Sequence, residues 1–252
     1  MPLNAITFDI WDTIVVDDSD EPKRASQGLR SKAEERRHLF WEALNREAPT
    51  DKAVTDLAYD MQEVMYRKVW FDAHITWKVA DRLQVMLDGL GRELPADAFD
   101  GLVEALETME MEIKPDLIDG AADVIKGLAG EFKLGIVSDA IYTPGRELRE
   151  LLGALGVGEY FSGFVFSDEV GRAKPHPDCF HDAARQMGTE LSEMLHIGDR
   201  DGKDVAGAQA LGMKAVLFTA TRDEGARDTT KADGVAGSYP ELADVIHEIA
   251  AR

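Results

Sequence analysis

Residues 6–15 read Ile-Thr-Phe-Asp-Ile-Trp-Asp-Thr-Ile-Val, an apolar run that ends in Asp9 and turns through Trp11, Asp12 and Thr13. The run alternates too little for a half-exposed strand, so it predicts a strand that is buried on both faces. Strands of this kind belong to parallel sheets with helices on either side. The stretch therefore predicts a buried strand with a carboxylate at its carboxyl end, where open α/β sheets bind ligands.

Four further short apolar runs occur in the second half of the chain, at residues 134–137, 164–166, 194–197 and 215–218. Helical periods lie between these runs and after the last one, at residues 119–130, 145–155, 177–187, 202–211 and 239–250. This alternation predicts an α/β fold with a doubly wound parallel sheet, whose strand ends meet at one edge. A polar stretch rich in Thr, Asp, Gly and Arg predicts an exposed loop at 221–234.

Residues 18–115 interrupt this pattern, because they contain helical periods and no convincing strand. The periods lie near residues 30–47, 51–71, 75–90 and 96–112. They predict an inserted α-helical cap, with residues 1–17 and 116–252 forming the α/β core. The three- and four-residue spacing of the hydrophobic side chains predicts a bundle core of Leu39, Phe40, Leu44, Leu57, Met61, Met65, Trp70, Trp77, Leu83, Met86, Leu87, Leu102 and Leu106.

The chain of 252 residues is strongly acidic, with a formal net charge of -20 at pH 7. This charge repels nucleic acids and anionic membranes, so we expect neither as a partner. The single cysteine, Cys179, cannot form an internal disulfide, and the N-terminal run contains Asp9 and Asp12 and lacks a basic leader. No apolar run reaches the roughly 18 residues needed to span a bilayer. We therefore expect a cytoplasmic protein, as a monomer or a homodimer.

Polar motifs follow four of the predicted strands. The first contains Asp9, and the second is Ser138, which closes the run Leu-Gly-Ile-Val-Ser. The third is Lys174, in Val-Gly-Arg-Ala-Lys-Pro-His-Pro, and the fourth is His-Ile-Gly-Asp-Arg-Asp-Gly-Lys-Asp, which contains Asp199 and Asp204. Each motif alone is a weak signal, but the fold is expected to gather all four at one edge of the sheet.

In order, spacing and strand context, these motifs resemble the signatures of the haloacid dehalogenase-like (HAD) hydrolase superfamily. The first motif of that family usually reads Asp-x-Asp-x-Thr, and Asp9 and Thr13 match its ends. The resemblance covers residues 6–13 and about 115–218, and it implies a Rossmann-like core. The predicted helical insert resembles the family only in its position, which is that of the helical cap in some members.

The resemblance also implies roles for the motif residues. Asp9 would be the nucleophile, while Lys174 and Ser138 would bind the phosphate as further catalytic residues. A carboxylate that attacks a phosphate monoester must overcome repulsion between two anions, so the site needs cations. The implied cofactor is Mg²⁺, which prefers oxygen ligands. Its ligands would be Asp9, the backbone carbonyl of Trp11, Asp199 and, directly or through water, Asp204.

Trp11 departs from the family pattern, since most phosphatases of the family carry a proton-donating Asp there. An indole N–H donates a hydrogen bond but does not titrate in water, so it cannot protonate a leaving group. Losing general acid catalysis costs about 10² to 10⁴ in rate. Acyl phosphates, phosphoanhydrides and carbon–halogen bonds need less help. Asp12 is one residue late; it either replaces the acid through a local bend of the chain or has a surface or turn-capping role.

Two charged features leave alternatives open. Asp139 follows Ser138, where the family often has Asn, and its charge is unfavourable beside a phosphate unless it points away or caps the next segment. Six basic residues also gather early in the predicted insert. They form either a solvated helix face paired with Glu34 and Glu35, or a surface that recognises an anionic substrate, with one Lys as a candidate for Schiff-base chemistry. They are Lys23, Arg24, Arg30, Lys32, Arg36 and Arg37.

The sequence therefore predicts a Mg²⁺-dependent HAD-like phosphatase of a small phosphorylated metabolite, which forms an aspartyl phosphate on Asp9 and prefers good leaving groups. A second hypothesis is a 2-haloacid dehalogenase or phosphonate hydrolase with the same nucleophile. Dehalogenases of the family work without metal and depart from the Gly-Asp pattern at the fourth motif, whereas Gly198 and Asp199 are present here. A third hypothesis, motivated by Trp11 and Asp139, is a catalytically weak ligand-binding or regulatory protein.

Overall fold

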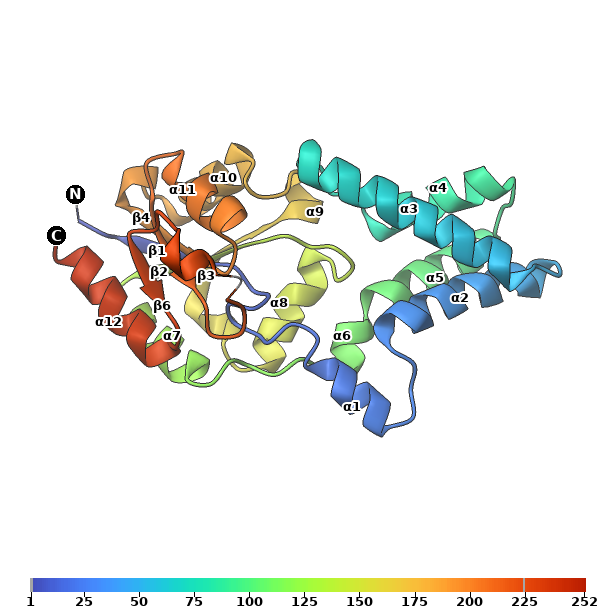
Figure 1. Cartoon of the computed structure of the whole chain (residues 1–252), viewed down its shortest axis with the longest axis horizontal. Helices are drawn as coiled ribbons and strands as arrows, with labels where there is room; N and C mark the ends of the chain where they lie inside the picture. The colour runs from blue at the N-terminus through green and yellow to red at the C-terminus, as the bar shows by residue number, and fades with distance from the viewer. Residues whose placement is uncertain (1, 224) are drawn as a thin grey trace.

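One parallel sheet, drawn at the left of Figure 1, forms the core of the α/β part of the molecule. The computed structural model of the chain describes residues 2–223 and 225–252; Met1 and Glu224, a part of the predicted loop, lie outside the described residues. The six strands in the described part have the order β3-β2-β1-β4-β5-β6. They are β1 (Ala5–Phe8), β2 (Lys133–Ser138), β3 (Phe161–Phe166), β4 (Met194–Gly198), β5 (Lys214–Phe218) and β6 (Gly234–Ala236). The predicted fold class and strands are confirmed, and β6 extends the sheet at the end of the predicted loop.

Helices cover both faces of this sheet, as expected for a parallel sheet with buried strands. One face packs against α7 (Ala121–Ala129), α8 (Gly145–Ala154) and α12 (Tyr239–Ala250). The other packs against α10 (Pro177–Met187) and α11 (Ala206–Gln209). The predicted helix at 202–211 begins as a π-helical turn, Asp201–Val205. Shorter helices are α9 (Ser167–Val170) and the 3-10 turns Gly158–Tyr160, Leu191–Glu193 and Ala226–Asp228.

The strand order reverses around β1, which pairs with β2 on one side and β4 on the other. The carboxyl ends of such neighbouring strands border a crevice at the sheet edge, the usual ligand site of this architecture. A side chain of α12 holds the loop after β1 in place. The buried Tyr239 Oη donates a hydrogen bond to the carbonyl of Thr13 at 2.7 Å. This hydrogen bond fixes the segment that follows Asp9 against the start of α12.

Six helices lie between β1 and α7, beside the sheet (Figure 1). They are α1 (Asp20–Ser26), α2 (Lys32–Glu47), α3 (Lys52–Asp72), α4 (Val79–Leu90), α5 (Ala96–Glu107) and α6 (Met109–Glu112), here called the helical insert. The insert has its own apolar cluster, which includes Phe40, Leu44, Leu83, Met86 and Leu106. Helix α1 was not predicted, and α4 starts four residues later than the predicted 75–90. No helix among the described residues is both long and apolar enough to cross a membrane.

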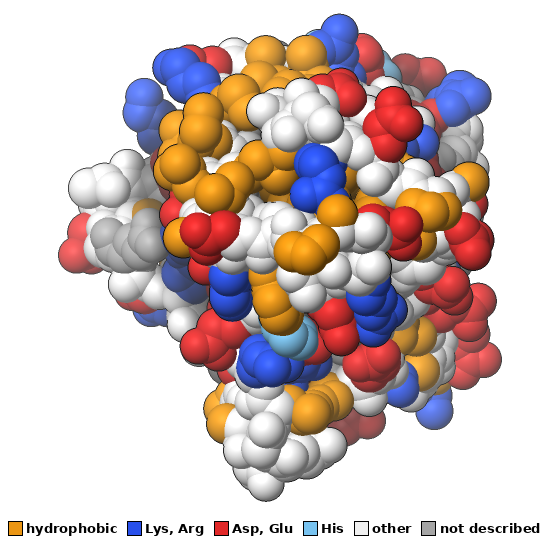
Figure 2. Space-filling model, turned by 90° about the vertical axis from the view of Figure 1, so that its right-hand side faces the viewer, with side chains coloured by type: hydrophobic (Ala, Val, Ile, Leu, Met, Phe, Trp, Pro, Cys, Tyr) orange, Lys and Arg blue, Asp and Glu red, His pale blue; other side chains and the backbone are white. Residues whose placement is uncertain are grey.

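The predicted bundle core is wrong for three residues of α3, because Leu57, Met61 and Met65 are 60%, 58% and 40% exposed, whereas the predicted Trp70 of the same helix is buried. Hydrophobic side chains gather on the upper part of the face of the molecule seen in Figure 2. The buried face of α3 is instead polar and aromatic, with Thr55, Tyr59, Gln62, Tyr66 and Trp70. The helical period of the prediction was correct, but the aliphatic stripe does not face the bundle.

Removing the Tyr239 hydroxyl tests how the loop after β1 is held. In Tyr239→Phe the ring stays buried and the Thr13 carbonyl loses its 2.7 Å hydrogen bond. We expect the free energy of unfolding to fall by about 1–3 kcal/mol, the usual cost of a buried polar group left unpaired. Urea denaturation measures the change. The control Tyr160→Phe, at a half-buried tyrosine, is expected to stay within about 0.5 kcal/mol of the wild type; equal losses in both variants would contradict this role of Tyr239.

Candidate active site

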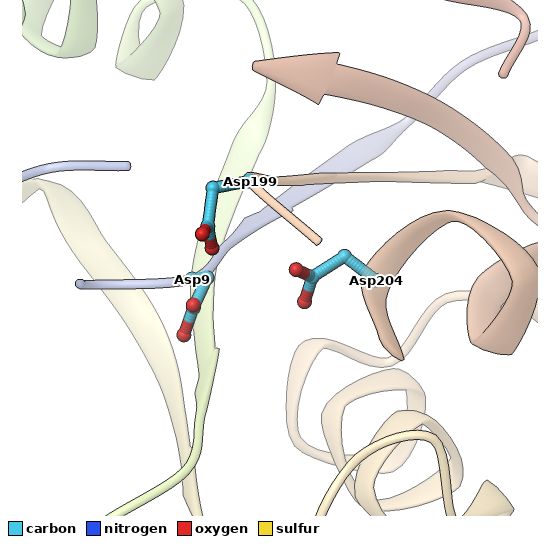
Figure 3. Close-up of side chains that lie close together, drawn as sticks. All are labelled: Asp9, Asp199 and Asp204. Carbon is cyan, nitrogen blue, oxygen red and sulfur yellow. The ribbon is translucent and has the colours of Figure 1, made fainter. Parts of the chain in front are cut away.

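Three buried carboxylates meet at the carboxyl edge of the sheet (Figure 3). Asp9 directly follows β1, Asp199 directly follows β4, and Asp204 lies in the π-helical turn after β4. Each residue offers an oxygen atom, and these three atoms lie within 4.8 Å of one another. The sequence brings them together because β1 and β4 are adjacent parallel strands, whose ends reach the same edge.

Lys174 places its ammonium group between two of these carboxylates. Its Nζ is 2.9 Å from Asp9 Oδ1 and 2.6 Å from Asp204 Oδ1, and the residue is 2% exposed. The lysine lies in the loop between α9 and α10, where its backbone N–H donates to Asp139 Oδ1 at 2.9 Å. A hydrogen bond on the backbone and two ion pairs on the side chain fix its position.

The three carboxylates and Lys174 together carry more negative than positive charge, and this excess affects the pKa values of the carboxyl groups. Burial, together with the charges of Asp9 and Asp204, raises the pKa of Asp199 to about 8. Burial also raises the pKa of Asp9, against the opposing effects of Lys174 and the Ser138 hydroxyl. Guanidinium nitrogens of Arg200 and Arg222 are 3.8 Å from Asp199, too distant for a strong ion pair. A divalent cation fits this donor set, because three clustered carboxylates offer the oxygen ligands that Mg²⁺ prefers.

Asp204 is held by more contacts than its two neighbours. Although burial alone raises the pKa of this carboxyl, Lys174 and His196 hold it well below its usual range. His196 Nε2 lies 3.1 Å from Asp204 Oδ1, and the Arg200 backbone N–H donates to Oδ2 at 2.9 Å. The other ring nitrogen of His196 lies 2.9 Å from Thr7 Oγ1, so this histidine is buried and fully partnered. Asp204 therefore remains ionised and oriented.

Asp139 has a structural explanation that the sequence did not provide. Its Oδ2 accepts a hydrogen bond from Lys203 Nζ at 2.8 Å, while its Oδ1 accepts from the Lys174 backbone. The Lys203 ammonium also lies 3.0 Å from the centre of the Trp70 ring of α3, a cation–π contact between core and insert. The charge of Asp139 is thus compensated, and the residue positions the loop that carries Lys174.

The two residues after Ile10 have different surroundings. Trp11 is half-buried and lines two adjoining cavities, a small one that includes Asp9 and Lys174 and a larger one towards the insert. Asp12 has a left-handed backbone, with φ of 54°, and its Oδ1 accepts hydrogen bonds from Thr221 Oγ1 at 2.8 Å and from the Asp17 N–H at 3.3 Å. The local bend exists, and these two hydrogen bonds tie the Asp12 carboxylate to Thr221 and to the backbone of Asp17.

Most of the basic cluster in the insert is paired. Lys32 is buried and contacts Asp20 at 2.8 Å, while Arg36 lies 3.3 Å from Glu110 and over the Tyr142 ring. Lys32 and Arg36 also line the larger cavity. The carboxylates that pair with Lys23, Arg30 and Arg37 are Asp116, Glu35 and Asp60. The cluster therefore stabilises the insert, and two of its members border the cavity.

The structure gathers all the residues proposed from the sequence around one point, although their catalytic and metal-binding roles stay predictions. Ser138, 2% exposed, ends β2 next to β1. The sequence did not identify two residues that border the site, Lys203 and Trp70. Lys203 stands between Asp199 and Asp204 in the fourth motif, and a lysine between two conspicuous acids was the available signal. Trp70 gave no separate signal, because its spacing matches a helix core.

Comparison with known proteins places this site in a family. Residues 3–212 match the model of the haloacid dehalogenase-like hydrolases. A glyceraldehyde 3-phosphate phosphatase of Methanopyrus kandleri is 34% identical over 122 residues, which cover 47% of this chain and 51% of that protein. The chain thus spans about half the length of this curated relative.

Solved structures share the fold over nearly the whole chain. A HAD phosphatase from Thermococcus onnurineus has a TM-score of 0.65 at 22% identity and covers 97% of this chain and 98% of its own. An L-2-haloacid dehalogenase from Xanthobacter autotrophicus has a TM-score of 0.57 at 16% identity and covers 97% and 98%. Because both a phosphatase and a dehalogenase match, the fold alone does not choose between these chemistries.

The close approach of Gly198 to Asp204 provides a test of the site geometry. A Cβ atom on Gly198 would lie 2.2 Å from Asp204 Cγ, so Gly198→Ala displaces the carboxylate from Lys174 and His196. We expect this variant to lose about 1–3 kcal/mol of unfolding free energy from overpacking. The control is Gly202→Ala in the π-helical turn that follows β4, since a Cβ there meets nothing within 4 Å. Thermal unfolding compares the two; equal stability of Gly198→Ala and Gly202→Ala would contradict the packing described.

Proposed function

Since the chain belongs to the haloacid dehalogenase-like hydrolase family, we propose that it is a Mg²⁺-dependent phosphatase of small phosphorylated metabolites. The observation that carries the proposal is the cluster of Asp9, Asp199 and Asp204 with Lys174 at the sheet edge. The named activity of the phosphatase from Methanopyrus kandleri supports the same class of substrate. Asp9, Asp199, Asp204 and the Trp11 carbonyl would hold Mg²⁺, which supplies positive charge for a phosphate group.

Asp9 is the proposed nucleophile. A carboxylate oxygen of Asp9 attacks phosphorus, the bond from phosphorus to the leaving oxygen breaks, and the electron pair stays on the departing group. Lys174, 2.9 Å from Asp9 Oδ1, favours the ionised carboxylate and offers N–H donors to the phosphate oxygens. Ser138, buried at the end of β2, adds a hydroxyl donor. Water then hydrolyses the aspartyl phosphate and restores Asp9.

The helical insert is the proposed cap, with residues 18–115 as its domain. Trp70 of α3 rests on Lys203 of the core, and the backbone N–H of Ala173 donates to the carbonyl of His74 at 2.8 Å. These contacts place the insert directly beside Asp139 and Lys174. A cap in this position excludes water from the reacting groups and supplies specificity.

The alternative chemistries have less support. A 2-haloacid dehalogenase or phosphonate hydrolase would use the same nucleophile, and the likeness to the dehalogenase from Xanthobacter autotrophicus concerns the fold. The clustering of Asp199 and Asp204 with Asp9 favours a phosphatase, since a metal site has a use in phosphoryl transfer. A binding or regulatory protein without turnover stays a hypothesis that the following activity measurements address.

Phosphate release from a metabolite panel tests the nucleophile and the cofactor together. We expect activity that requires Mg²⁺, disappears with a chelator and is abolished in Asp9→Asn, since an amide is a far weaker nucleophile than a carboxylate. Asp12→Asn is the control, because Asp12 is bound to Thr221 and lies outside the walls of both cavities. Activity that survives Asp9→Asn would refute the nucleophile, and loss of activity in Asp12→Asn would make Asp12 the missing acid.

The second test concerns Trp11 and the leaving group. Without a general acid, hydrolysis of an alkyl phosphate loses about 10² to 10⁴ in rate, while an acyl phosphate loses little. We therefore expect kcat/KM for acetyl phosphate to exceed that for glycerol 3-phosphate by a factor in this range. Steady-state kinetics at saturating Mg²⁺ gives the ratio. Equal values would mean that another side chain protonates the leaving oxygen.

A further inference from the structure

A cavity of about 400 Å³ lies between the helical insert and the loops at the sheet edge. It shares Trp11, Trp70, Ile141 and Arg200 with the smaller cavity that contains Asp9, Lys174 and Asp204. A group bonded to a phosphate at Asp9 would therefore extend into the larger cavity. Its volume falls within the range of roughly 300–1,000 Å³ that is typical of sites for drug-sized ligands.

The walls of this cavity are unusually aromatic. Five of its fifteen lining residues are aromatic, compared with 8% of the whole chain. Three of them come from the end of α3 and two from the core, so the aromatic side chains face the space from both parts of the molecule. They are Trp11, Tyr66, Trp70, Phe71 and Tyr142. Aromatic rings bind other rings in stacked or edge-to-face arrangements.

Two of these residues carry buried donors without partners. Trp70 Nε1 and Tyr66 Oη are inaccessible to solvent and form no hydrogen bond with any residue that the structure describes. A buried group that makes no hydrogen bond is costly, so these two donors mark a place where the packing around the cavity is incomplete. Trp70 lines both cavities, at the junction between the phosphate and the group attached to it.

Phe71 adds a further indication, because this large apolar ring is 53% exposed although it packs edge-on against Trp70 at 4.7 Å. A planar ligand in the cavity would cover part of it. Eight of the fifteen lining residues are charged, four acidic and four basic, so the cavity has no excess of positive charge for a second anionic group. Two of the basic residues, Lys32 and Arg36, contact Asp20 and Glu110. The apolar part of the wall that is left for a leaving group is mainly aromatic, since Ile141 is its one aliphatic residue.

We infer that the preferred substrate is a phosphate monoester of a planar aromatic alcohol, an aryl phosphate, whose ring occupies this cavity. The inference rests on the proposed phosphatase function. It also fits Trp11, because a phenol has a pKa of about 10, as tyrosine does, and leaves as an anion far more easily than an alkoxide. The Asp9 oxygen bonds to phosphorus, the bond from phosphorus to the aryl oxygen breaks, and the phenolate leaves with the electron pair and takes a proton from water.

The decisive experiment separates the effect of an aromatic ring on binding from the effect of the leaving group on the rate. Benzyl phosphate and cyclohexylmethyl phosphate both release a primary alkoxide but differ in the planarity of the ring. We expect kcat/KM to be higher for benzyl phosphate, by about two- to twelvefold for each ring contact. Phenyl phosphate, which releases a phenolate, should exceed benzyl phosphate. Equal kcat/KM values for the benzyl and cyclohexylmethyl esters would overturn the aromatic site.

Variants on α3 test whether the preference for an aromatic ring arises in this cavity. Phe71→Leu should lower the ratio of benzyl to cyclohexylmethyl kcat/KM, and because Phe71 is half exposed the variant is expected to fold. Met61→Leu is the matched control on the same helix, since Met61 is 58% exposed and lies outside the cavity wall. It should keep the wild-type ratio. An unchanged ratio in Phe71→Leu would overturn the assignment of the cavity.

Non-reacting analogues measure binding without chemistry. Benzylphosphonate should inhibit the hydrolysis of acetyl phosphate with a lower inhibition constant than cyclohexylmethylphosphonate, and equal constants would count against the aromatic site. Acetyl phosphate also keeps the two proposals separate, because its leaving group has no ring. Mg²⁺-dependent hydrolysis of acetyl phosphate without a preference for rings refutes only this inference, while the absence of phosphate release from every ester and from acetyl phosphate refutes the proposed function itself.

Discussion

Lys174 holds an ammonium group between the buried carboxylates of Asp9 and Asp204, and the arrangement of the sheet edge depends on these ion pairs. Removing one partner of a buried pair typically costs about 3–5 kcal/mol, because the other charge is left uncompensated. The surrounding contacts maintain this geometry. Asp139 fixes the backbone of Lys174, and His196 and the Arg200 N–H fix Asp204. Burial and the neighbouring charges of Asp9 and Asp204 raise the pKa of Asp199, whose nearest guanidinium nitrogens, of Arg200 and Arg222, are 3.8 Å away.

The sequence predicted the residues at the centre of this site because each follows a short apolar run, a pattern that is visible along the chain. A buried run followed by a polar residue indicates a strand end, and adjacent parallel strands bring those ends together. Asp9, Ser138 and Asp199 follow this rule directly. The partners of Asp139 could not be predicted, since Lys203 is 64 residues away and reaches it only through the folded loop. A charge that looks unfavourable in sequence was compensated by a contact that only the fold defines.

The helical insert shows a second limit of prediction from the sequence, which concerns the orientation of a helix. Periodicity gave most of its helices, but it did not identify which face of α3 is buried. The inward face carries Tyr59, Tyr66 and Trp70, whereas the aliphatic Leu57 and Met61 face outwards. The burial of the aromatic face of α3 follows from its contacts with a cation. Arg82 of α4 is almost fully buried and donates a hydrogen bond to the Ile141 carbonyl at 3.1 Å. Its guanidinium group also lies 4.3 Å from the centre of the Tyr66 ring. Aromatic rings can serve such a cation, and aliphatic side chains cannot.

Trp11 connects the chemistry at the sheet edge with the character of the insert. By the family motif we predict that an indole at this position leaves the site without a proton donor, and Trp11 also lines both cavities, where the proposed leaving group would lie. These two effects favour the same substrates, because phenols are more acidic than aliphatic alcohols and their rings also pack well against aromatic side chains. A loss of acid catalysis is tolerable when the leaving group needs little help. The tryptophan that departs from the family motif is thus consistent with a hydrolase whose specificity depends on the leaving group.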